Sequence, residues 1–455
     1  MKKFNIIFLY MAAVAAAAML FSGCSKDNDN PGNGPSNPSG PDKPEQVVSA
    51  PSLVVYEANP RFFGTENCLN ALSAQLERIK NLGCDVVWIM PVCEPSQEKS
   101  VGSPYSIKNY DAINPKYGTI ADLQNLVKSA HNLGLKVILD WVPNHTGWDN
   151  PWVTEHPDWF MQRNGQIISP PGQNWNDVAQ LNYNNPEVAP AMADAIEFWV
   201  TTADVDGFRF DYADSPNIPS SFWIDLAKDL KAMKSDMLLL AESSNYNFYS
   251  YGYDMIYDWN SAPTISSAFK SEKAAAIVPE GVKAWTEVPE GDSILRYVFN
   301  HDTMSENSIN SYYVSLDALP TAYVCAAMLN GTPLIYSGMD AEGLTGTQSF
   351  FNYKTLTFSD KLTPVYKAIN DAFKASADVR GGTLNDYSNG PIMAFTKTAG
   401  SHNLLVVVNC SNKDQQYVTP MSIRYLEMKD LINNNSTSIP VTIDLTAYGY
   451  AIYMN

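Results

Sequence analysis

Charged and polar side chains stand at the ends of several apolar runs in this sequence of 455 residues. These residues are Asp140, Arg209, Asp211, Glu242, His301 and Asp302. Charged side chains are seldom buried without a partner, although a single acid at the end of a strand would mean little. Acids that end four different strands of one parallel barrel converge on a common pocket, where they could act as acids, bases or nucleophiles.

The segment from Gly207 to Asp211 indicates how such side chains are presented. Alternate residues of a strand point to opposite faces, so Arg209 and Asp211 share one face while Phe208 and Phe210 share the other. We expect the phenylalanines to pack toward helices. The charged pair would then point into the mouth of the fold.

Near-continuous apolar runs, which predict strands, alternate with amphipathic segments, which predict helices. The expected strands are Leu53–Ala58, Asp85–Val92, Lys136–Val142, Gly207–Asp211, Met237–Glu242, Tyr253–Tyr257, Ile294–Asn300 and Pro333–Tyr336. The expected helices include Leu69–Leu82, Leu123–Leu133, Ala189–Thr201, Phe222–Met233 and Ala318–Leu329. Apolar strands separated by helices indicate a parallel sheet buried on both faces. Eight such units favour an α/β fold of the (β/α)8 TIM-barrel type over a doubly wound sheet.

The spacing of the acidic residues agrees with a barrel. Asp211 and Glu242 are 31 residues apart, which fits one strand–helix unit. Asp140 and Asp211 are 71 residues apart, which is too long for one unit. The excess predicts a subdomain of about 144–185, inserted after the third strand, that covers the C-terminal mouth of the barrel.

The N-terminus predicts export and lipidation. Residues 1–23 combine a basic start with an apolar run shorter than the roughly 20 residues that span a bilayer, which is typical of a signal peptide. The junction Leu-Phe-Ser-Gly-Cys24 resembles a bacterial lipobox, in which Cys24 becomes the lipidated first residue; an ordinary secretory cleavage site is the alternative. The residues that follow resemble the acidic signals of cell-surface lipoproteins from Bacteroidetes. We therefore expect an outer-membrane lipoprotein that meets the membrane only through this anchor.

The remaining chain divides by composition into three parts. The stretch 24–48 is rich in Pro, Gly and Ser and predicts a flexible tether. A barrel is expected at 49–380. Short alternating runs without helices predict a small all-β sandwich domain at 381–455.

The overall charge limits the possible ligands. A formal net charge of -18 without basic patches argues against nucleic acid and against an anionic substrate, and it favours a neutral ligand. The cysteines after Cys24 are odd in number, widely scattered and without metal-ligand spacing. We expect them to be small buried hydrophobic residues rather than a disulfide framework.

Four segments resemble, in order and spacing, the signature regions of the α-amylase family, glycoside hydrolase family 13. They are Leu139-Asp-Trp-Val-Pro-Asn-His145, Gly207-Phe-Arg-Phe-Asp211, Leu240-Ala-Glu242 and Phe299-Asn-His-Asp302. The segments Gly102-Ser-Pro-Tyr-Ser and Asn109–Gly118 resemble a further family region. The resemblance extends over about 50–455. It implies a retaining hydrolase that acts on α-glucans.

The resemblance also implies a division of labour among the acids. Asp211 would be the nucleophile, Glu242 the general acid/base and Asp302 the third carboxylate, which stabilises the transition state. A retaining glycosidase needs one carboxyl group that stays ionised and one that stays protonated, about 5–5.5 Å apart. The charge of Arg209 would keep the nucleophile ionised, and crowding by the two aspartates would keep the acid protonated.

Substrate contacts are implied in the same way. His145 and His301 would hydrogen-bond sugar hydroxyls, and Tyr105 would stack on the sugar. Asp140 would organise Arg209 and the groups beside it.

Two departures from the family pattern concern the acceptor side and a structural calcium. Asp214 and Ser215 stand where many relatives have Lys-His, and Gln180 stands where many have an aspartate that binds calcium. Asn144 is the one expected ligand that is present. Calcium prefers six to eight oxygen ligands with carboxylates among them. We therefore expect no calcium at this site and no other cofactor.

The sequence thus predicts hydrolysis of α-glucosidic bonds in starch-like α-glucans or maltooligosaccharides. Two alternatives stay open. A transglycosylase would share the covalent intermediate and differ in whether a sugar hydroxyl or water resolves it. A surface starch-binding protein without catalysis would have no need of the three carboxylates.

Overall fold

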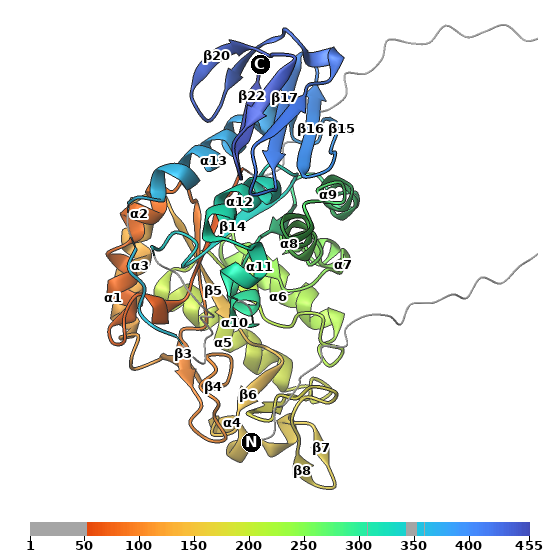
Figure 1. Ribbon diagram of the computed structural model, residues 1–455. Coiled ribbons are helices and arrows are strands. Elements are labelled where there is room, and N and C mark those ends of the chain that lie inside the picture. The colour runs from red at the N-terminus through yellow and green to blue at the C-terminus, as the bar shows by residue number, and fades with distance from the viewer. Residues whose placement is uncertain (1–51, 307, 343–352, 359) are drawn as a thin grey trace, which may run out of the picture. The chain divides into compact units, whose positions relative to one another are not determined.

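The computed structural model describes residues 52–306, 308–342, 353–358 and 360–455 (Figure 1). The expected signal peptide, the lipidation site at Cys24 and the tether lie outside these residues. Across the described ranges, no helix is both long and apolar enough to cross a bilayer.

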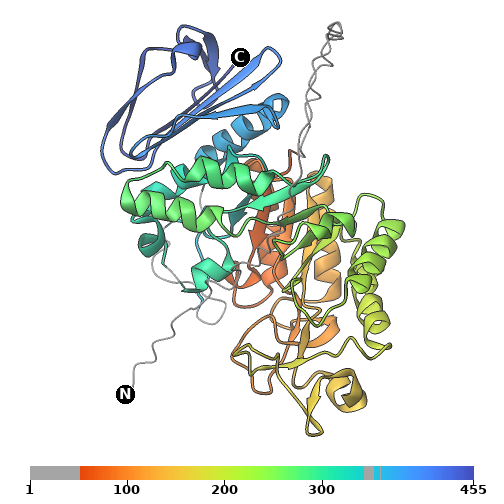
Figure 2. The ribbon, with the colours of Figure 1, turned by 90° about the vertical axis from the view of Figure 1, so that its right-hand side faces the viewer.

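Eight parallel strands close into a barrel, which confirms the expected fold class (Figures 1 and 2). Around the barrel they are β1 (Val55–Ala58), β14 (Thr332–Tyr336), β13 (Ser293–Arg296), β12 (Met255–Tyr257), β11 (Leu238–Ala241), β10 (Gly207–Phe210), β5 (Lys136–Trp141) and β2 (Val86–Ile89). Arg209 in β10 is in register with Asp140 in β5 and Leu240 in β11. The residues that follow these strands therefore meet at one end of the barrel.

Helices lie between successive barrel strands. The helices around and after the barrel are α3 (Ile120–Asn132), α5 (Val188–Ala203), α6 (Ser220–Met233), α7 (Asn247–Ser250), α8 (Ser261–Ser271), α9 (Ile277–Trp285), α10 (His301–Glu306), α11 (Ile309–Tyr313), α12 (Leu319–Ala327) and α13 (Thr363–Ala375). The expected helix Leu69–Leu82 is instead two short helices, α1 (Cys68–Ser73) and α2 (Leu76–Asn81). The break occurs because the amide of Gln75 donates to the carbonyl of Leu72, only three residues back, which tightens the chain there.

The chain between β5 and α5 forms the inserted subdomain. It contains β6 (His145–Gly147), α4 (Pro151–Glu155), β7 (Gln162–Arg163), β8 (Gln166–Ile167) and β9 (Val178–Gln180). Strands β6 and β9 pair antiparallel, with His145 opposite Gln180. A separate hairpin after β2, made of β3 (Cys93–Pro95) and β4 (Ile107–Ile113), carries Tyr105 in its connection. The insertion after the third barrel strand is therefore present.

The C-terminal part is an all-β domain, as expected. Its six-stranded sheet has the order β15 (Thr383–Asp386), β16 (Ile392–Ala399), β17 (His402–Asn409), β22 (Tyr450–Met454), β19 (Glu427–Asp430) and β20 (Asn435–Ser438). A second pair joins β18 (Gln415–Val418) to β21 (Thr442–Leu445). A separate apolar core that includes Leu405, Val407 and Ile443 fills this domain. Lys397 in β16 donates to the carbonyl of Met328, which follows α12.

The cysteines behave as the sequence predicts. Cys68, Cys84, Cys93, Cys325 and Cys410 are all free and buried. Burial raises the pKa of the Cys68 thiol to about 11, so it stays protonated near neutral pH. These residues therefore act as small hydrophobic side chains.

Candidate active site

Strand β10 presents its side chains on two faces, as the alternating pattern predicts. The ring of Phe208 packs against Trp141 at 6.1 Å, and that of Phe210 packs against Trp223 of α6 at 5.6 Å. The first residue of the strand, Gly207, must be glycine, because a Cβ there would lie 2.0 Å from the carbonyl oxygen of Leu238 in the neighbouring strand. Arg209 consequently faces the opposite side, toward the acids.

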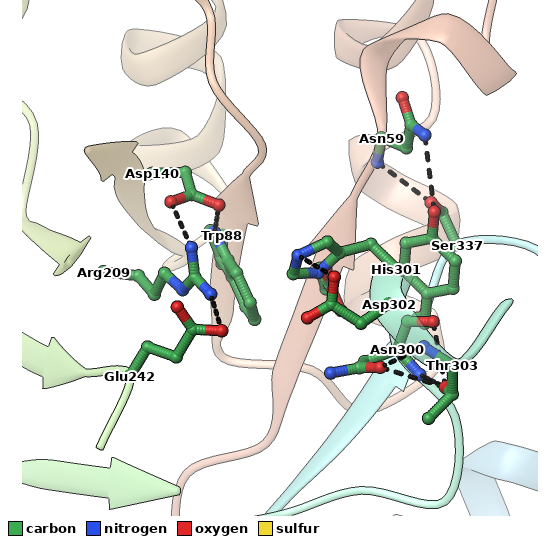
Figure 3. Close-up of polar contacts among 12 residues, drawn as sticks. Asn59, Trp88, Asp140, Arg209, Glu242, Asn300, His301, Asp302, Thr303 and Ser337 are labelled. Atoms are coloured by element: carbon green, nitrogen blue, oxygen red, sulfur yellow. Dashed lines mark hydrogen bonds and ion pairs between the residues drawn. The ribbon is translucent and has the colours of Figure 1, made fainter. Parts of the chain in front are cut away.

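Arg209 is the centre of the charged pocket. Its guanidinium is fully buried and lies 2.8 Å from Asp140 Oδ1 and 2.7 Å from Glu242 Oε1 (Figure 3). It also lies 3.1 Å from Asp211 Oδ1. A fourth contact runs from Nε to the hydroxyl of Tyr257 at 3.2 Å. One cation thus holds three carboxylates from three neighbouring strands, and the side chains of Asp211 and Glu242 keep 15% and 13% exposure.

Glu242 lies where a proton donor would be expected. Burial raises the pKa of its carboxyl, Arg209 opposes that rise, and the charges of Asp211 and Asp302 increase it further. Burial is therefore the main cause of the raised pKa, and crowding by the aspartates, the cause expected from the sequence, is a smaller one. The amide of Tyr212 donates to Glu242 Oε2 at 2.6 Å. Tyr212 has φ 46°, a left-handed conformation that costs a non-glycine residue about 1–3 kcal/mol.

Asp140 links the guanidinium to an aromatic wall. Its Oδ2 accepts hydrogen bonds from the Trp88 indole at 3.2 Å and from the Tyr105 hydroxyl at 2.9 Å. Burial raises the pKa of Asp140 to about 6, although Arg209 lowers it. The expected role of Asp140 in organising Arg209 agrees with these contacts.

His301 and Asp302 begin a helix rather than end a strand, so that part of the sequence interpretation is wrong. Strand β13 ends at Arg296, and α10 begins at His301. Asn300 and Thr303 cap the helix reciprocally, since each backbone amide donates to the other's side-chain oxygen, at 2.8 and 2.9 Å. Asp302 remains 48% exposed, and Figure 3 shows it across from Arg209 and Glu242.

His301 is tied into the pocket by three polar neighbours. Its Nδ1 lies 2.5 Å from Glu57 Oε1, and its Nε2 lies 2.9 Å from the Tyr105 hydroxyl and 3.4 Å from Asp302 Oδ1. The Tyr105 ring stacks on the imidazole at 5.5 Å. Tyr105 and His301 therefore lie together beside the acids, as the motifs predict.

His145 is more loosely connected to the carboxylates than the other predicted residues. Its Nδ1 lies 3.1 Å from Asn144 Nδ2, and its ring lies 5.7 Å from that of Trp175. Burial lowers the pKa of His145, while the charges of Asp211 and Asp177 raise it. A neutral ring whose Nδ1 accepts from Asn144 carries its proton on Nε2.

The residues at the family's calcium position do not fit a cation. Gln180 Nε2 lies 2.8 Å from the Asn144 carbonyl, 3.1 Å from Asn144 Oδ1 and 3.0 Å from the Leu181 carbonyl. Backbone carbonyls only accept hydrogen bonds, so an amide N–H must face them. The hydroxyl of Ser215 donates to the same Asn144 Oδ1 at 2.6 Å. In the described residues these oxygens converge on an amide donor, and no carboxylate contacts Asn144 or Gln180.

Three residues of the pocket do not follow from the family motifs. Glu57, Trp88 and Tyr257 contact His301, Asp140 and Arg209 respectively. Glu57 ends the first apolar run just as Asp140 ends the third, so the same criterion could have found it. Buried aromatic residues at strand ends are usual in cores, and the sequence offers no comparable signal for Trp88 or Tyr257.

Comparison with known proteins shows which family this chain resembles. Residues 57–381 match the family model described as the alpha amylase catalytic domain. Alpha-amylase MalA of Haloarcula japonica is 27% identical over 79% of this chain and 55% of its own length, and the maltogenic alpha-amylase of Bacillus acidopullulyticus is 24% identical over 86% and 71%. A crystal structure of an alpha-amylase from Lactobacillus plantarum superposes with a TM-score of 0.78 at 25% identity, over 89% of this chain and 99% of that one.

The family model spans well over half of the chain, and it includes Asp140 in β5 as well as Asp211 and Glu242, which directly follow β10 and β11. The barrel, the inserted subdomain and the C-terminal β domain are all present. The chain therefore belongs to the α-amylase family of glycoside hydrolases, family 13.

Proposed function

We propose that this enzyme hydrolyses α-glucosidic bonds of starch-like α-glucans or maltooligosaccharides with retention of configuration. The observation that carries the proposal is the single buried guanidinium of Arg209, which contacts both Asp211 and Glu242. It gives Asp211 a buried counter-charge, while burial favours a protonated Glu242. Two adjacent carboxyl groups with opposite protonation are what a double displacement requires.

The reaction would proceed in two balanced steps. Asp211 attacks the anomeric carbon while the bond to the leaving oxygen breaks, and Glu242 gives its proton to that oxygen. The product of this step is a covalent ester between the sugar and Asp211. A water molecule then attacks the same carbon, Glu242 takes one of its protons, and Asp211 is released as a carboxylate. Each step inverts the carbon, so the net result is retention.

Asp302 and the histidines would act on the sugar or beside it. Asp302 is the most exposed of the three carboxylates, which suits a group that binds sugar hydroxyls directly. His145 accepts from Asn144 at Nδ1, and a ring N–H donates to the backbone carbonyl of Tyr105, so this histidine would act by holding the chain around Tyr105 in place beside the sugar. Tyr105 is 9% exposed and its ring stacks on His301, so only a small part of the ring is left to contact a sugar.

The substrate class is supported by the relatives, which are named as amylases. The test is to incubate the purified whole chain with starch, pullulan and maltooligosaccharides and to separate the products by chromatography. We expect new reducing ends on at least one α-glucan, and their loss in Asp211→Ala. Longer oligosaccharides without new reducing ends would indicate a transglycosylase. Binding without any product would indicate a starch-binding protein and would contradict the proposal.

We further propose that the enzyme needs no calcium at Asn144, because the amide of Gln180 takes up the oxygens that a cation would require. We also propose that the chain is anchored to the outer membrane through a lipid on Cys24. The signal-like residues 1–23 and the tether 24–48 support the anchor. Wild type should sediment with membranes and Cys24→Ala should not; equal partitioning of both would contradict the anchor.

A further inference from the structure

Glu57 is a buried acid in β1 to which the proposed reaction assigns no role. Its side chain is 0% exposed, and its Oε1 lies 2.5 Å from Nδ1 of His301. Its other oxygen, Oε2, has no hydrogen-bond partner among the described residues. A buried carboxylate is costly without a counter-charge, so the contact with His301 is the one that compensates it.

The hydrogen-bond network around His301 can be assigned from the groups that can only accept. Asp140 takes a hydrogen bond from Arg209 and another from Trp88, so it acts as an acceptor toward the Tyr105 hydroxyl. The hydroxyl proton of Tyr105 is therefore directed to Asp140. Its oxygen, 2.9 Å from His301 Nε2, must accept a proton from that nitrogen.

The other nitrogen of His301 faces a carboxylate. Nδ1 can donate to an ionised Glu57 only if it too carries a proton, which makes the ring an imidazolium. The alternative is a neutral ring that accepts a proton from a protonated Glu57. The two arrangements have the same total charge and differ in where one proton lies.

Burial raises the pKa of the Glu57 carboxyl and so works against its ionised form, while His301 and Arg209 lower that pKa. The negative charges around the ring favour the imidazolium. Burial disfavours a charged ring, but the negative charges of Asp302 and Glu57 outweigh it and raise the pKa of His301 to about 9. Arg209, at the other side of Tyr105, opposes this effect without reversing it. The ring is also held in place by Trp88, which meets it edge-on at 5.9 Å.

We propose that Glu57 is a positioning residue that keeps a second proton on His301 and so fixes the Nε2–H toward Tyr105 and Asp302. His301 then supplies a fixed positive charge 3.4 Å from Asp302, which holds the carboxylate proposed to bind the sugar in position. The consequence for catalysis rests on the proposed function, whereas the protonation state of His301 is independent of it.

The experiment is an NMR titration of His301 in the whole chain labelled with ¹⁵N-histidine. The chain contains five histidines, so the His301 signals are identified by their loss in His301→Gln. An imidazolium has two protonated nitrogens and a neutral ring has one, so the nitrogen shifts distinguish the two arrangements directly. The variant is Glu57→Gln, and the matched control is Glu94→Gln, which removes an acid that pairs with Lys108 at 2.7 Å outside the pocket.

In wild type we expect an imidazolium at pH 7 that loses its proton near pH 9. In Glu57→Gln this loss should occur about 1–3 pH units lower, and Glu94→Gln should match wild type. The KM of Glu57→Gln for a maltooligosaccharide should exceed that of wild type at pH 8 and approach it at lower pH, where His301 regains its proton. A merely structural role for Glu57 would change KM equally at both pH values.

Two results would overturn the proposal: a neutral His301 in wild type at pH 7, or the same titration in Glu57→Gln as in wild type. The measurement on wild type needs no variant, so it tests the proposal even if Glu57→Gln fails to fold. If the titrations come out as expected but no α-glucan is cleaved, the proposed function fails and the role of Glu57 in protonating His301 stands.

Discussion

Replacing Arg209 by methionine should destabilise the protein in a way that depends on pH. The guanidinium is 0% exposed and contacts Asp140, Asp211 and Glu242 within 3.1 Å. Removing one partner of a buried ion pair typically costs about 3–5 kcal/mol, because the remaining charge is left uncompensated. We expect a loss of about this size in the free energy of unfolding near pH 7.5.

The sign of the pH dependence follows from Asp140. Its pKa in the folded protein is about 6, above the ordinary value of 3.8, since burial outweighs Arg209. The contribution of such a group to stability is complete below about pH 4 and is lost as pH rises through 6. Without Arg209 its pKa rises further. The deficit of the variant should therefore be largest at neutral pH and shrink at about pH 4.

The assay is urea unfolding of wild type and Arg209→Met at pH 7.5 and pH 4.5, with Lys136→Met as the control. Lys136 pairs with Asp236 at the surface, where such pairs contribute about 0–1 kcal/mol, so its removal should matter little at either pH. An equal deficit for Arg209→Met at both pH values would refute the electrostatic reasoning. It would mean that Arg209 stabilises the barrel by its volume alone.

Three further predictions concern single residues. A chelator should leave the Tm of wild type unchanged, whereas Gln180→Asp should lower it and make it respond to calcium, because a carboxylate then replaces the amide donor; a wild-type Tm that falls with the chelator would contradict this. Phe210→Ala should lower the free energy of unfolding by about 3–5 kcal/mol, measured by chemical unfolding, since the ring packs on Trp223. A loss below about 1 kcal/mol would contradict this and would show that neighbouring side chains fill the cavity. The raised pKa of Glu242 predicts that kcat/KM falls on the alkaline side as this acid loses its proton, and that Glu242→Gln lowers the rate and removes that limb; an unchanged limb would assign it to another group.

The fold could be predicted from periodicity because the barrel strands are short, continuous and apolar. Each of the eight strands overlaps its expected range. The error at β13 arose because the apolar run continues to Phe299, although hydrogen bonding in the ladder stops at Arg296. The asparagine at 300 and threonine at 303 could have indicated the helix start, as a polar residue and a partner three positions later are typical of a cap.

The candidate site could be predicted only where single residues follow strands. Asp140, Arg209 and Asp211 lie together as expected, because β5 and β10 are in register. The contact between Arg209 in β10 and Glu242 after β11 depends on the conformations of the two side chains. The two residues belong to separate motifs, and neither motif predicts that they touch. The dominance of burial over crowding at Glu242 likewise depends on how completely neighbouring side chains exclude water, which spacing in the sequence does not encode.

The central claim is that Asp211 forms a covalent bond with the sugar. A slowly hydrolysed fluorinated α-glucosyl fluoride should trap this intermediate, and peptide mass spectrometry should then locate it. We expect the added mass of one sugar on the peptide that contains Asp211, and none in Asp211→Ala. A label on Glu242 or Asp302, or turnover of the reagent by Asp211→Ala, would contradict the account.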